Sequence, residues 1–324
     1  KGDIVSLNPS VPPGTSEDIV LPILEEESGL KIEQDFYMVY NPERIYEGRA
    51  IEDIEVRYPA IVAGAGVKSL EIGAKLYSLV AKKGVIKMGN IRTAETEKLL
   101  EGVYRDVNIA LANEMAKFCE KAGVDFWEAR SAANSQPYCH IHRPGIGVGG
   151  ACIPIYPKFI LGLAEQLNVR CDMTKIGRSI NDSMPSYCVK KALQLVKKAN
   201  PSELTVCVLG LAFRGGVSDT RLSPTYAVIK ELKKYGVKKI KVHDPFVIED
   251  PDLDSDVILT SNLGECLRDC DLIIVTADHQ DYRKLGKSDF GDVAIYDGRG
   301  ILSREEIRKL RYATLGFKDG DNKS

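Results

Sequence analysis

Residues 1 to 93 alternate short apolar runs with longer segments of mixed polarity. The apolar runs cover residues 3–7, 36–40, 60–63 and 85–88, and residues 16–27 between the first two have helical spacing. Strands that alternate with helices are typical of parallel α/β packing. We therefore expect an α/β unit of the doubly wound kind in this part of the chain.

Residues 94 to 197 have the spacing of long helices instead. From Ala94 to Ala122 apolar side chains recur close to the helical period, and Gly123 follows as a stop signal. A second long helix is predicted to pass through Ile180 and to end at Lys198. We expect these helices to form a connector and a surface for self-association.

From residue 198 to residue 324 the alternation of strands and helices returns. Strands are predicted at 206–210, 239–244, 271–276, 292–297 and 312–316, with helices at 224–235 and 263–268 and a further turn near His279. The predicted fold is thus α/β, with two doubly wound Rossmann-like domains, residues 1–93 and 198–324, joined by a central helical region. The first domain looks truncated, because Lys1 directly precedes its first strand and residues 1–93 contain no Gly-x-Gly-x-x-Gly turn.

Ligands of doubly wound sheets gather at the carboxyl ends of the strands. The turn after the first strand of the C-terminal domain lacks the dinucleotide glycines, so a nucleotide there would be held by arginines, unless these are ordinary surface charges. The polar and aromatic side chains predicted at these strand ends are Phe213, Arg214, Arg221, Asp244, Asp297 and Arg299.

Charge and cysteine content narrow the class of protein. The net charge of -2 gives no general attraction to nucleic acid or membrane, and no apolar run is long enough to span a bilayer. The chain has 8 cysteines without the paired spacing of a zinc site, Cys266 with Cys270 and the Cys139 to His142 cluster included, so we expect no metal. Scattered cysteines and the absence of a signal-like opening favour reduced thiols and a cytoplasmic location.

The segment 144–154 contains the strongest candidate chemistry. Glycines crowd the residues before Cys152, so the backbone can approach a ligand closely, and Pro157 starts a predicted helix just beyond. A helix N-terminus favours the thiolate, which makes Cys152 a candidate nucleophile. The alternative is a small buried residue in a glycine-rich turn.

Six motifs in one order resemble the UDP-glucose/GDP-mannose dehydrogenase family. They are Ser10-Val-Pro-Pro-Gly-Thr, Asn41-Pro-Glu-Arg-Ile-Tyr-Glu-Gly-Arg, Ala94-Glu-Thr-Glu-Lys-Leu-Leu-Glu, Gly147-Val-Gly-Gly-Ala-Cys-Ile-Pro, Leu211-Ala-Phe-Arg with Asp219-Thr-Arg-Leu-Ser-Pro, and Tyr296-Asp-Gly-Arg. The stretch from Tyr104 to Glu114 is most similar to the branch that oxidises UDP-N-acetylmannosamine.

The resemblance implies a four-electron oxidation of the sugar C6 alcohol to an acid, with two NAD molecules reduced, in polysaccharide biosynthesis. Cys152 would form a thiohemiacetal with the aldehyde, and the resulting thioester would be hydrolysed. UDP-glucose and UDP-N-acetylgalactosamine are alternative substrates. A nucleotide-sugar-binding protein that has lost turnover is the alternative function.

The resemblance also assigns roles to residues. Lys98 would transfer a proton and stabilise the C6 oxyanion, although an exposed lysine paired with Glu101 or Glu95 is the alternative. Ser10 takes the place of a threonine that orients water near the nicotinamide. The resemblance also implies that Glu47 contacts NAD and that Arg221 contacts substrate or NAD. The sugar would be contacted by Arg44, Ile45 and Arg105, with Arg105 reaching it across a homodimer, and Gly149 and Gly150 would lie beside the substrate. UDP would be bound by Phe213, Arg214 and Arg299.

Four positions depart from the family pattern. Tyr156 stands where the family has an aspartate that assists thioester hydrolysis, and Gly102 stands where it has an asparagine that shares the oxyanion. Ala151 replaces a common histidine, and Ile155 replaces a cofactor-contacting lysine of some members. Because tyrosine is a poor base at neutral pH, thioester hydrolysis is the step we expect to be impaired.

Overall fold

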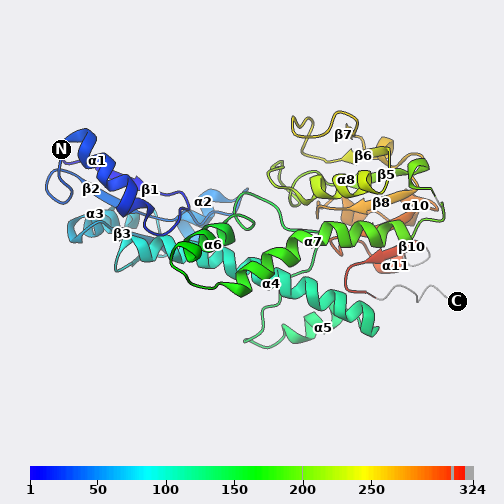
Figure 1. The fold of residues 1–324 in the computed structure, drawn as a ribbon, viewed down its shortest axis with the longest axis horizontal. Helices are drawn as coiled ribbons and strands as arrows, with labels where there is room; N and C mark the ends of the chain where they lie inside the picture. The colour runs from blue at the N-terminus through cyan, green and yellow to red at the C-terminus, as the bar shows by residue number, and fades with distance from the viewer. Residues whose placement is uncertain (199, 308–309, 318–324) are drawn as a thin grey trace. The chain divides into compact units, whose positions relative to one another are not determined.

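The computed structural model describes residues 1–198, 200–307 and 310–317, which pack as two compact units (Figure 1). The first unit comprises residues 1–104 and 155–171, and the second comprises residues 105–154 and the part of the chain from Asp172 onward. Within the described ranges, no helix is long and apolar enough to cross a membrane.

The first unit is built on a four-stranded sheet in the order β1-β2-β3-β4. Its strands are β1 (Ile4–Leu7), β2 (Tyr37–Tyr40), β3 (Ala60–Gly64) and β4 (Val85–Lys87), which confirms the four predicted strands. β2 and β3 are antiparallel, whereas the other two pairs are parallel. The expectation of purely parallel packing was wrong here, because residues 41–59 return the chain at the same edge of the sheet without a crossover.

Several helices accompany this sheet in the first unit. They are η1 (Ser16–Val20), α1 (Leu21–Ser28), α2 (Ala50–Glu52), η2 (Asp53–Arg57), α3 (Val67–Ser78), the first part of α4 (Ile91–Ala122) and α6 (Tyr156–Gln166). Met38 and Tyr40 of β2 pack with Ile61 of β3 and with Ile91 and Ala94 of α4 in one core. This packing fixes the start of α4 against the carboxyl ends of β1 and β2.

The second unit contains a six-stranded parallel sheet in the order β10-β9-β8-β5-β6-β7. The strands are β5 (Thr205–Leu209), β6 (Lys239–His243), β7 (Ile258–Thr260), β8 (Leu272–Val275), β9 (Ala294–Asp297) and β10 (Arg311–Thr314). The order reverses between β5 and β8, which is the switch point of a doubly wound sheet. The prediction of this fold is confirmed; only the three-residue β7 was missed.

Both faces of the second sheet are covered, as a parallel sheet requires. Val206 and Val208 of β5 face a core with α7 (Asp172–Gln194) and α8 (Pro224–Lys234). Cys207 and Leu209 face the opposite core. The remaining short helices are α5 (Phe126–Ala133), η3 (Pro201–Glu203), α9 (Leu263–Leu267), η4 (Tyr282–Lys284), α10 (Lys287–Phe290) and α11 (Arg304–Ile307).

The long helices differ from prediction mainly at one end. α4 starts at Ile91 and stops before Gly123, which has a left-handed φ of 73°. α7 ends at Gln194 and not at Lys198 as predicted, because Leu195 and Val196 donate to carbonyls three residues back, in a tight turn that leaves the helix. The division into domains 1–93, 94–197 and 198–324 stays a prediction.

Candidate active site

The glycine segment before Cys152 is held against two loops of the second sheet. The N–H of Ile146 donates to the Gly298 carbonyl at 3.0 Å, and the N–H of Gly150 donates to the Arg221 carbonyl, also at 3.0 Å. At its start, the N–H of Gly145 donates to Oδ1 of Asn113 on α4 at 2.8 Å. The segment is therefore fastened at three points, all within the second unit.

The glycines are required by close packing. A Cβ atom at position 149 would lie 2.7 Å from the Leu222 carbonyl oxygen and 2.8 Å from Cβ of Phe213. Gly150 has a φ of +89° and faces the Phe213 ring, from which a Cβ atom would be 3.0 Å away. The structure thus brings Gly149 and Gly150 together with Phe213, as expected for one site.

Cys152 is exposed. It differs in this from Cys188 and Cys207, which are fully buried in the cores of the second unit. The alternative of a small buried core residue therefore does not apply to Cys152. A thiol that solvent reaches is available for attack on a bound carbonyl carbon.

Phe213, Arg214 and Arg299 form a cationic cluster beside the switch point. Nη2 of Arg299 donates to the Phe213 carbonyl at 3.1 Å, and the Arg214 guanidinium lies 5.6 Å from the Phe213 ring centroid. Asp278 lies 3.9 Å from Arg299. Burial works against ionisation of Asp278, but Arg299 and the Gly215 N–H outweigh it and lower the pKa of this carboxyl group.

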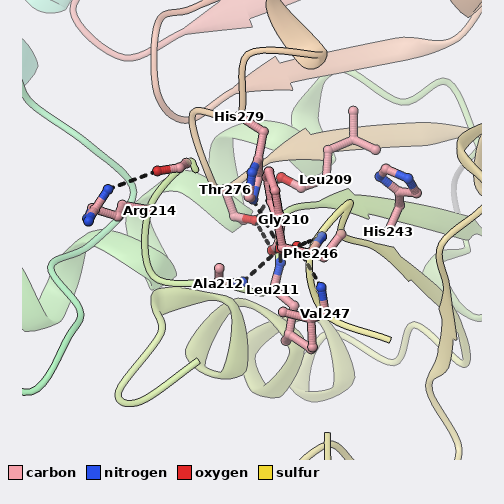
Figure 2. Close-up of polar contacts among 12 residues, drawn as sticks. Leu209, Gly210, Leu211, Ala212, Arg214, His243, Phe246, Val247, Thr276 and His279 are labelled. Carbon is pink, nitrogen blue, oxygen red and sulfur yellow. Dashed lines mark hydrogen bonds and ion pairs between the residues drawn. The ribbon is translucent and has the colours of Figure 1, made fainter. Parts of the chain in front are cut away.

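The loop that carries Phe213 and Arg214 is ordered by Asp244, which follows β6. Oδ2 of this fully buried carboxylate accepts from the N–H of Leu211 at 2.8 Å and of Ala212 at 2.9 Å, and Oδ1 accepts from the N–H of Phe246 at 2.9 Å. His279 Nε2 lies 3.1 Å from Oδ2. Figure 2 shows Leu211, Ala212, Phe246, Val247 and His279 converging on this point, with Arg214 on the same loop.

A second buried aspartate orders the loop that carries Arg299. Asp297, at the end of β9, accepts hydrogen bonds from the N–H groups of four residues, and that of Arg299 is 3.0 Å away. Burial raises the pKa of Asp297, although these N–H groups oppose the shift. Asp244 and Asp297 were both predicted at strand ends, and the structure shows that each organises a loop.

Two further predicted residues lie on exposed parts of the second unit. Arg221 forms a hydrogen-bonded ion pair with Asp219, at 2.6 Å, and its side chain is 71% exposed. Arg105 on α4 is exposed. The contacts of Arg221 and Arg105 with substrate or NAD remain predictions.

In the first unit, Lys98 and Ser10 gather around Tyr156. Ser10 Oγ donates to the Tyr156 hydroxyl at 2.7 Å, and the Lys98 ammonium lies 5.9 Å from the Tyr156 ring centroid. Lys98 is only 8% exposed, so it is not the exposed helix lysine of the alternative interpretation. Its proposed partners are engaged elsewhere: Glu101 pairs with Arg44, and Glu95 binds backbone N–H groups.

Glu95 fastens the loop after β1 to α4. Its carboxylate accepts from the N–H of Gly14 at 2.5 Å and from the N–H of Ser16 at 2.9 Å. The side chain is fully buried. Glu95 lies about one helical turn before Lys98, so the loop after β1 is fastened to the same part of α4 that carries Lys98.

Arg44 joins a group of charges on α4. Its Nη2 lies 2.8 Å from Oε1 of Glu101. Burial, and then the nearby Glu101, raise the pKa of Glu97 to about 7, while Arg44 and Lys98 oppose the shift. Ile45 and Glu47 are exposed.

A cavity of about 270 Å³ opens at the carboxyl ends of β1 and β2. Arg44 and Ile45 line it, but Ser10 and Lys98 do not. Asn8 and Asn41 at its wall are linked by a hydrogen bond from Asn8 Nδ2 to the Asn41 carbonyl at 2.9 Å. In the part of the chain that the structure describes, no three His, Cys, Asp or Glu side chains are placed to hold a metal ion.

The sequence pattern did not indicate Asn113, His279, Asp278 or Glu97. Asn113 lies inside a helix and His279 in a loop between strands, so their partners are visible only after folding. For Asp278 a weaker signal existed, since it comes three residues after the end of β8, whereas Asp244 directly follows β6. For Glu97, the sequence offers no sign of a role beyond the neighbouring Lys98.

Three family descriptions match successive parts of the chain. The NAD binding domain of the UDP-glucose/GDP-mannose dehydrogenase family matches residues 1–81, its central domain matches residues 92–183, and its UDP binding domain matches residues 207–304. These ranges include both groups of site residues described above.

Individual proteins agree with this match. The UDP-N-acetyl-D-mannosamine dehydrogenase of Pyrococcus horikoshii is 35% identical over 95% of this chain and 71% of its own. The NDP-N-acetyl-D-galactosaminuronic acid dehydrogenase of Ralstonia solanacearum is 30% identical over 95% and 72%. A solved structure of the Pyrococcus horikoshii UDP-D-ManNAc dehydrogenase superposes with a TM-score of 0.87, at 32% identity over 98% and 73% of the two chains. The chain therefore belongs to the UDP-glucose/GDP-mannose dehydrogenase family and is an NAD-dependent nucleotide-sugar dehydrogenase.

Proposed function

We propose that this protein oxidises the C6 hydroxyl of a UDP-N-acetylhexosamine to a carboxylate through a covalent intermediate on Cys152. The observation that carries the proposal is the attachment of the glycine segment to the UDP-binding loops. Hydrogen bonds from Ile146 and Gly150 tie this segment to Gly298 and Arg221, next to the residues assigned to UDP. An exposed thiol follows directly in sequence.

The second unit supplies the diphosphate site in this proposal. Arg214 and Arg299 carry guanidinium groups, whose forked donors suit phosphate oxygens. Phe213 offers an aromatic face to the uridine, and Gly149 and Gly150 allow its side chain to pack directly against the backbone of the segment before Cys152.

The first unit supplies the groups for proton transfer. Bound NAD supplies the acceptor for the hydride that leaves C6. The proton of the C6 hydroxyl passes to water that Ser10 orients, and the Lys98 ammonium donates a hydrogen bond to the C6 oxygen and stabilises the negative charge that develops there. For the whole reaction, one alcohol, two NAD⁺ and one water give one carboxylate, two NADH and three protons.

Covalent catalysis explains why a thiol is needed. The intermediate aldehyde is attacked by the Cys152 thiolate, and the resulting thiohemiacetal carries a hydride that a second NAD⁺ can accept. The product is a thioester, which water hydrolyses to the acid. Tyr156 is the departure that bears on this last step, since a phenol is a weak base at neutral pH.

The residues of the first unit fit one end of NAD better than the other. Asn8 and Ser10 follow β1 and Asn41 follows β2, so all three lie beyond the carboxyl ends of parallel strands, where ligands of such sheets gather. The N–H groups of Gly14 and Ser16, by contrast, are taken by the Glu95 carboxylate and are not available to a pyrophosphate. The resemblance to the family assigns Ser10 to the nicotinamide end and Glu47 to NAD.

The preferred substrate is UDP-N-acetylmannosamine. This preference rests on the relatives, several of which are named for that sugar, whereas others are named for an N-acetylgalactosamine derivative. UDP-glucose is a third choice within the family. The sugars differ at C2 and C4, so comparing kcat/KM for the three nucleotide sugars tests the preference directly.

A nucleotide-sugar-binding protein without turnover is the second candidate function. It is favoured by Tyr156 and Gly102, because neither supplies the carboxylate or amide that the family has there. Incubation of the protein with UDP-N-acetylmannosamine and NAD, followed at the absorbance of NADH, separates the two functions. Two NADH per sugar support the oxidation to the acid, and calorimetric binding without NADH formation supports the second function.

We also propose that the protein is a homodimer or a higher homo-oligomer through its central helices. Leu111 and Phe118 lie one heptad apart on α4 and are exposed, as are Met173 and Ile176 on α7. Exposed apolar side chains of this size favour association. Sedimentation equilibrium tests the proposal, and a monomer at micromolar concentration would contradict it.

A further inference from the structure

Tyr156 connects two residues of the proposed catalytic site. It is the first residue of α6 and is only 6% exposed. Its hydroxyl group accepts a hydrogen bond from Ser10 Oγ at 2.7 Å, and the Lys98 ammonium lies 5.9 Å from the centroid of its ring. All three residues belong to the first unit.

Gly102 makes the space that this ring occupies. A Cβ atom at position 102 would overlap Cδ2 of Tyr156 and would lie 3.0 Å from its Cβ. Gly102 is in the interior of α4, one turn after Lys98, and is not among the glycines of positive φ. The helix backbone does not require a glycine there, so the ring of Tyr156 is the reason for it.

We propose that Tyr156 is a positioning residue for catalysis and that Gly102 is its space-making partner. The phenol ring presents its face to the Lys98 ammonium, and the phenol oxygen fixes the rotamer of the Ser10 hydroxyl. The Tyr156 side chain thus fixes the positions of both the Lys98 ammonium and the Ser10 hydroxyl. This inference rests on the proposed function, in which Lys98 and Ser10 act on the substrate.

Tyr156→Phe separates positioning from packing. It keeps the ring and the space beside Gly102 but removes the acceptor for Ser10 Oγ. We expect kcat to fall about fivefold to tenfold, the loss of one net hydrogen bond, with KM for the nucleotide sugar and the melting temperature nearly unchanged. Tyr138→Phe, at a tyrosine that is 94% exposed, is the matched control and should change neither constant.

A double-mutant cycle tests whether the two hydroxyl groups act as a pair. Ser10→Ala and Tyr156→Phe should be non-additive, so that the double variant is no slower than the slower single variant. Multiplication of the two rate losses would overturn the positioning role. So would an unchanged kcat for Tyr156→Phe in a protein that otherwise reduces NAD, and that result would leave the proposed function intact.

The space-making part is tested without turnover. Gly102→Ala should lower the melting temperature in the presence of Tyr156, whereas in a Tyr156→Ala background it should be neutral or stabilising. Equal destabilisation in both backgrounds would overturn the pairing of Gly102 with Tyr156. Failure of the wild-type protein to reduce NAD would defeat the proposed function. Thermal unfolding needs no substrate, so the pairing of Gly102 with Tyr156 can be tested even in that case.

Discussion

Replacement of Asp244 should destabilise the loops that its carboxylate holds, which are proposed to bind UDP. The carboxylate accepts from the N–H groups of Leu211, Ala212, Phe246 and Val247 and lies 3.1 Å from His279 Nε2. Asp244→Asn keeps one carbonyl oxygen but places an amide N–H₂ opposite backbone donors, so at least two of these bonds are lost.

The loss of stability follows from the number of backbone N–H groups that lose their acceptor. A hydrogen bond to a charged acceptor contributes about 1.5 to 3 kcal/mol, so the free energy of unfolding should fall by about 3 kcal/mol for Asp244→Asn. Asp244→Ala leaves all four backbone donors without an acceptor and should cost about 6 kcal/mol. Both are large fractions of the stability of a typical domain, about 5 to 15 kcal/mol.

Urea unfolding followed by tryptophan fluorescence reports on this unit alone. The sequence has 1 Trp, and Nε1 of Trp127 donates to the Leu315 carbonyl at 2.8 Å within the second unit. Asp252→Ala, at an exposed aspartate of the same unit, is the control and should stay within about 0.5 kcal/mol of wild type. UDP affinity, measured by calorimetry, should fall together with stability for Asp244→Asn.

The pH dependence gives a second check. The net effect of the His279 and backbone hydrogen bonds, against burial, is to lower the pKa of Asp244. A lowered carboxyl pKa stabilises the fold above the unfolded value of about 4, and this contribution is lost as the pH falls below it. The difference in the free energy of unfolding between wild type and Asp244→Asn should therefore become smaller below about pH 4. A destabilisation under about 1 kcal/mol at pH 7, or a gap independent of pH, would refute the reasoning.

Three other predictions test the site. Cys152→Ser should abolish acid formation, measured by mass spectrometry of the nucleotide sugar; undiminished acid would reject the nucleophile. Glu97 has a pKa raised to about 7, so its contribution to stability should decline as the pH rises from about 4.5 to 7. Glu97→Gln should flatten the pH dependence of the melting temperature in that window, and an unaltered profile would contradict the assignment. Arg299→Lys should weaken UDP binding about tenfold by calorimetry, because an ammonium lacks the fork that also reaches the Phe213 carbonyl, and equal affinity would exclude Arg299 from the diphosphate site.

Strand ends and loops could be predicted because they depend on local pattern. The run before Asp297 is short and apolar, and the run before Asp244 alternates polar residues with Ile240 and Val242, so both aspartates fall at the ends of strand-like patterns. The glycines before Cys152 indicated a close approach to the backbone, and the structure shows that Phe213 makes it.

The rest depends on contacts far apart in sequence. Ser10 and Tyr156 are 146 positions apart, and no periodicity of either segment indicates their hydrogen bond. The antiparallel pairing of β2 with β3 was missed because residues 41–59 contain short helices that resemble a crossover. The sequence comparison with the family showed Tyr156 and Gly102 as two separate departures, whereas packing makes them one complementary change.

The hydrogen bonds from Gly14 and Ser16 to Glu95 limit how the segment that carries Ser10 can be reused in protein design. A graft of residues 8–16 into another scaffold would transplant a serine whose position is set by an acidic side chain on a different element. The transplant would need a helix bearing a carboxylate three residues before its lysine, since a loop moved alone loses the support that preorganises it.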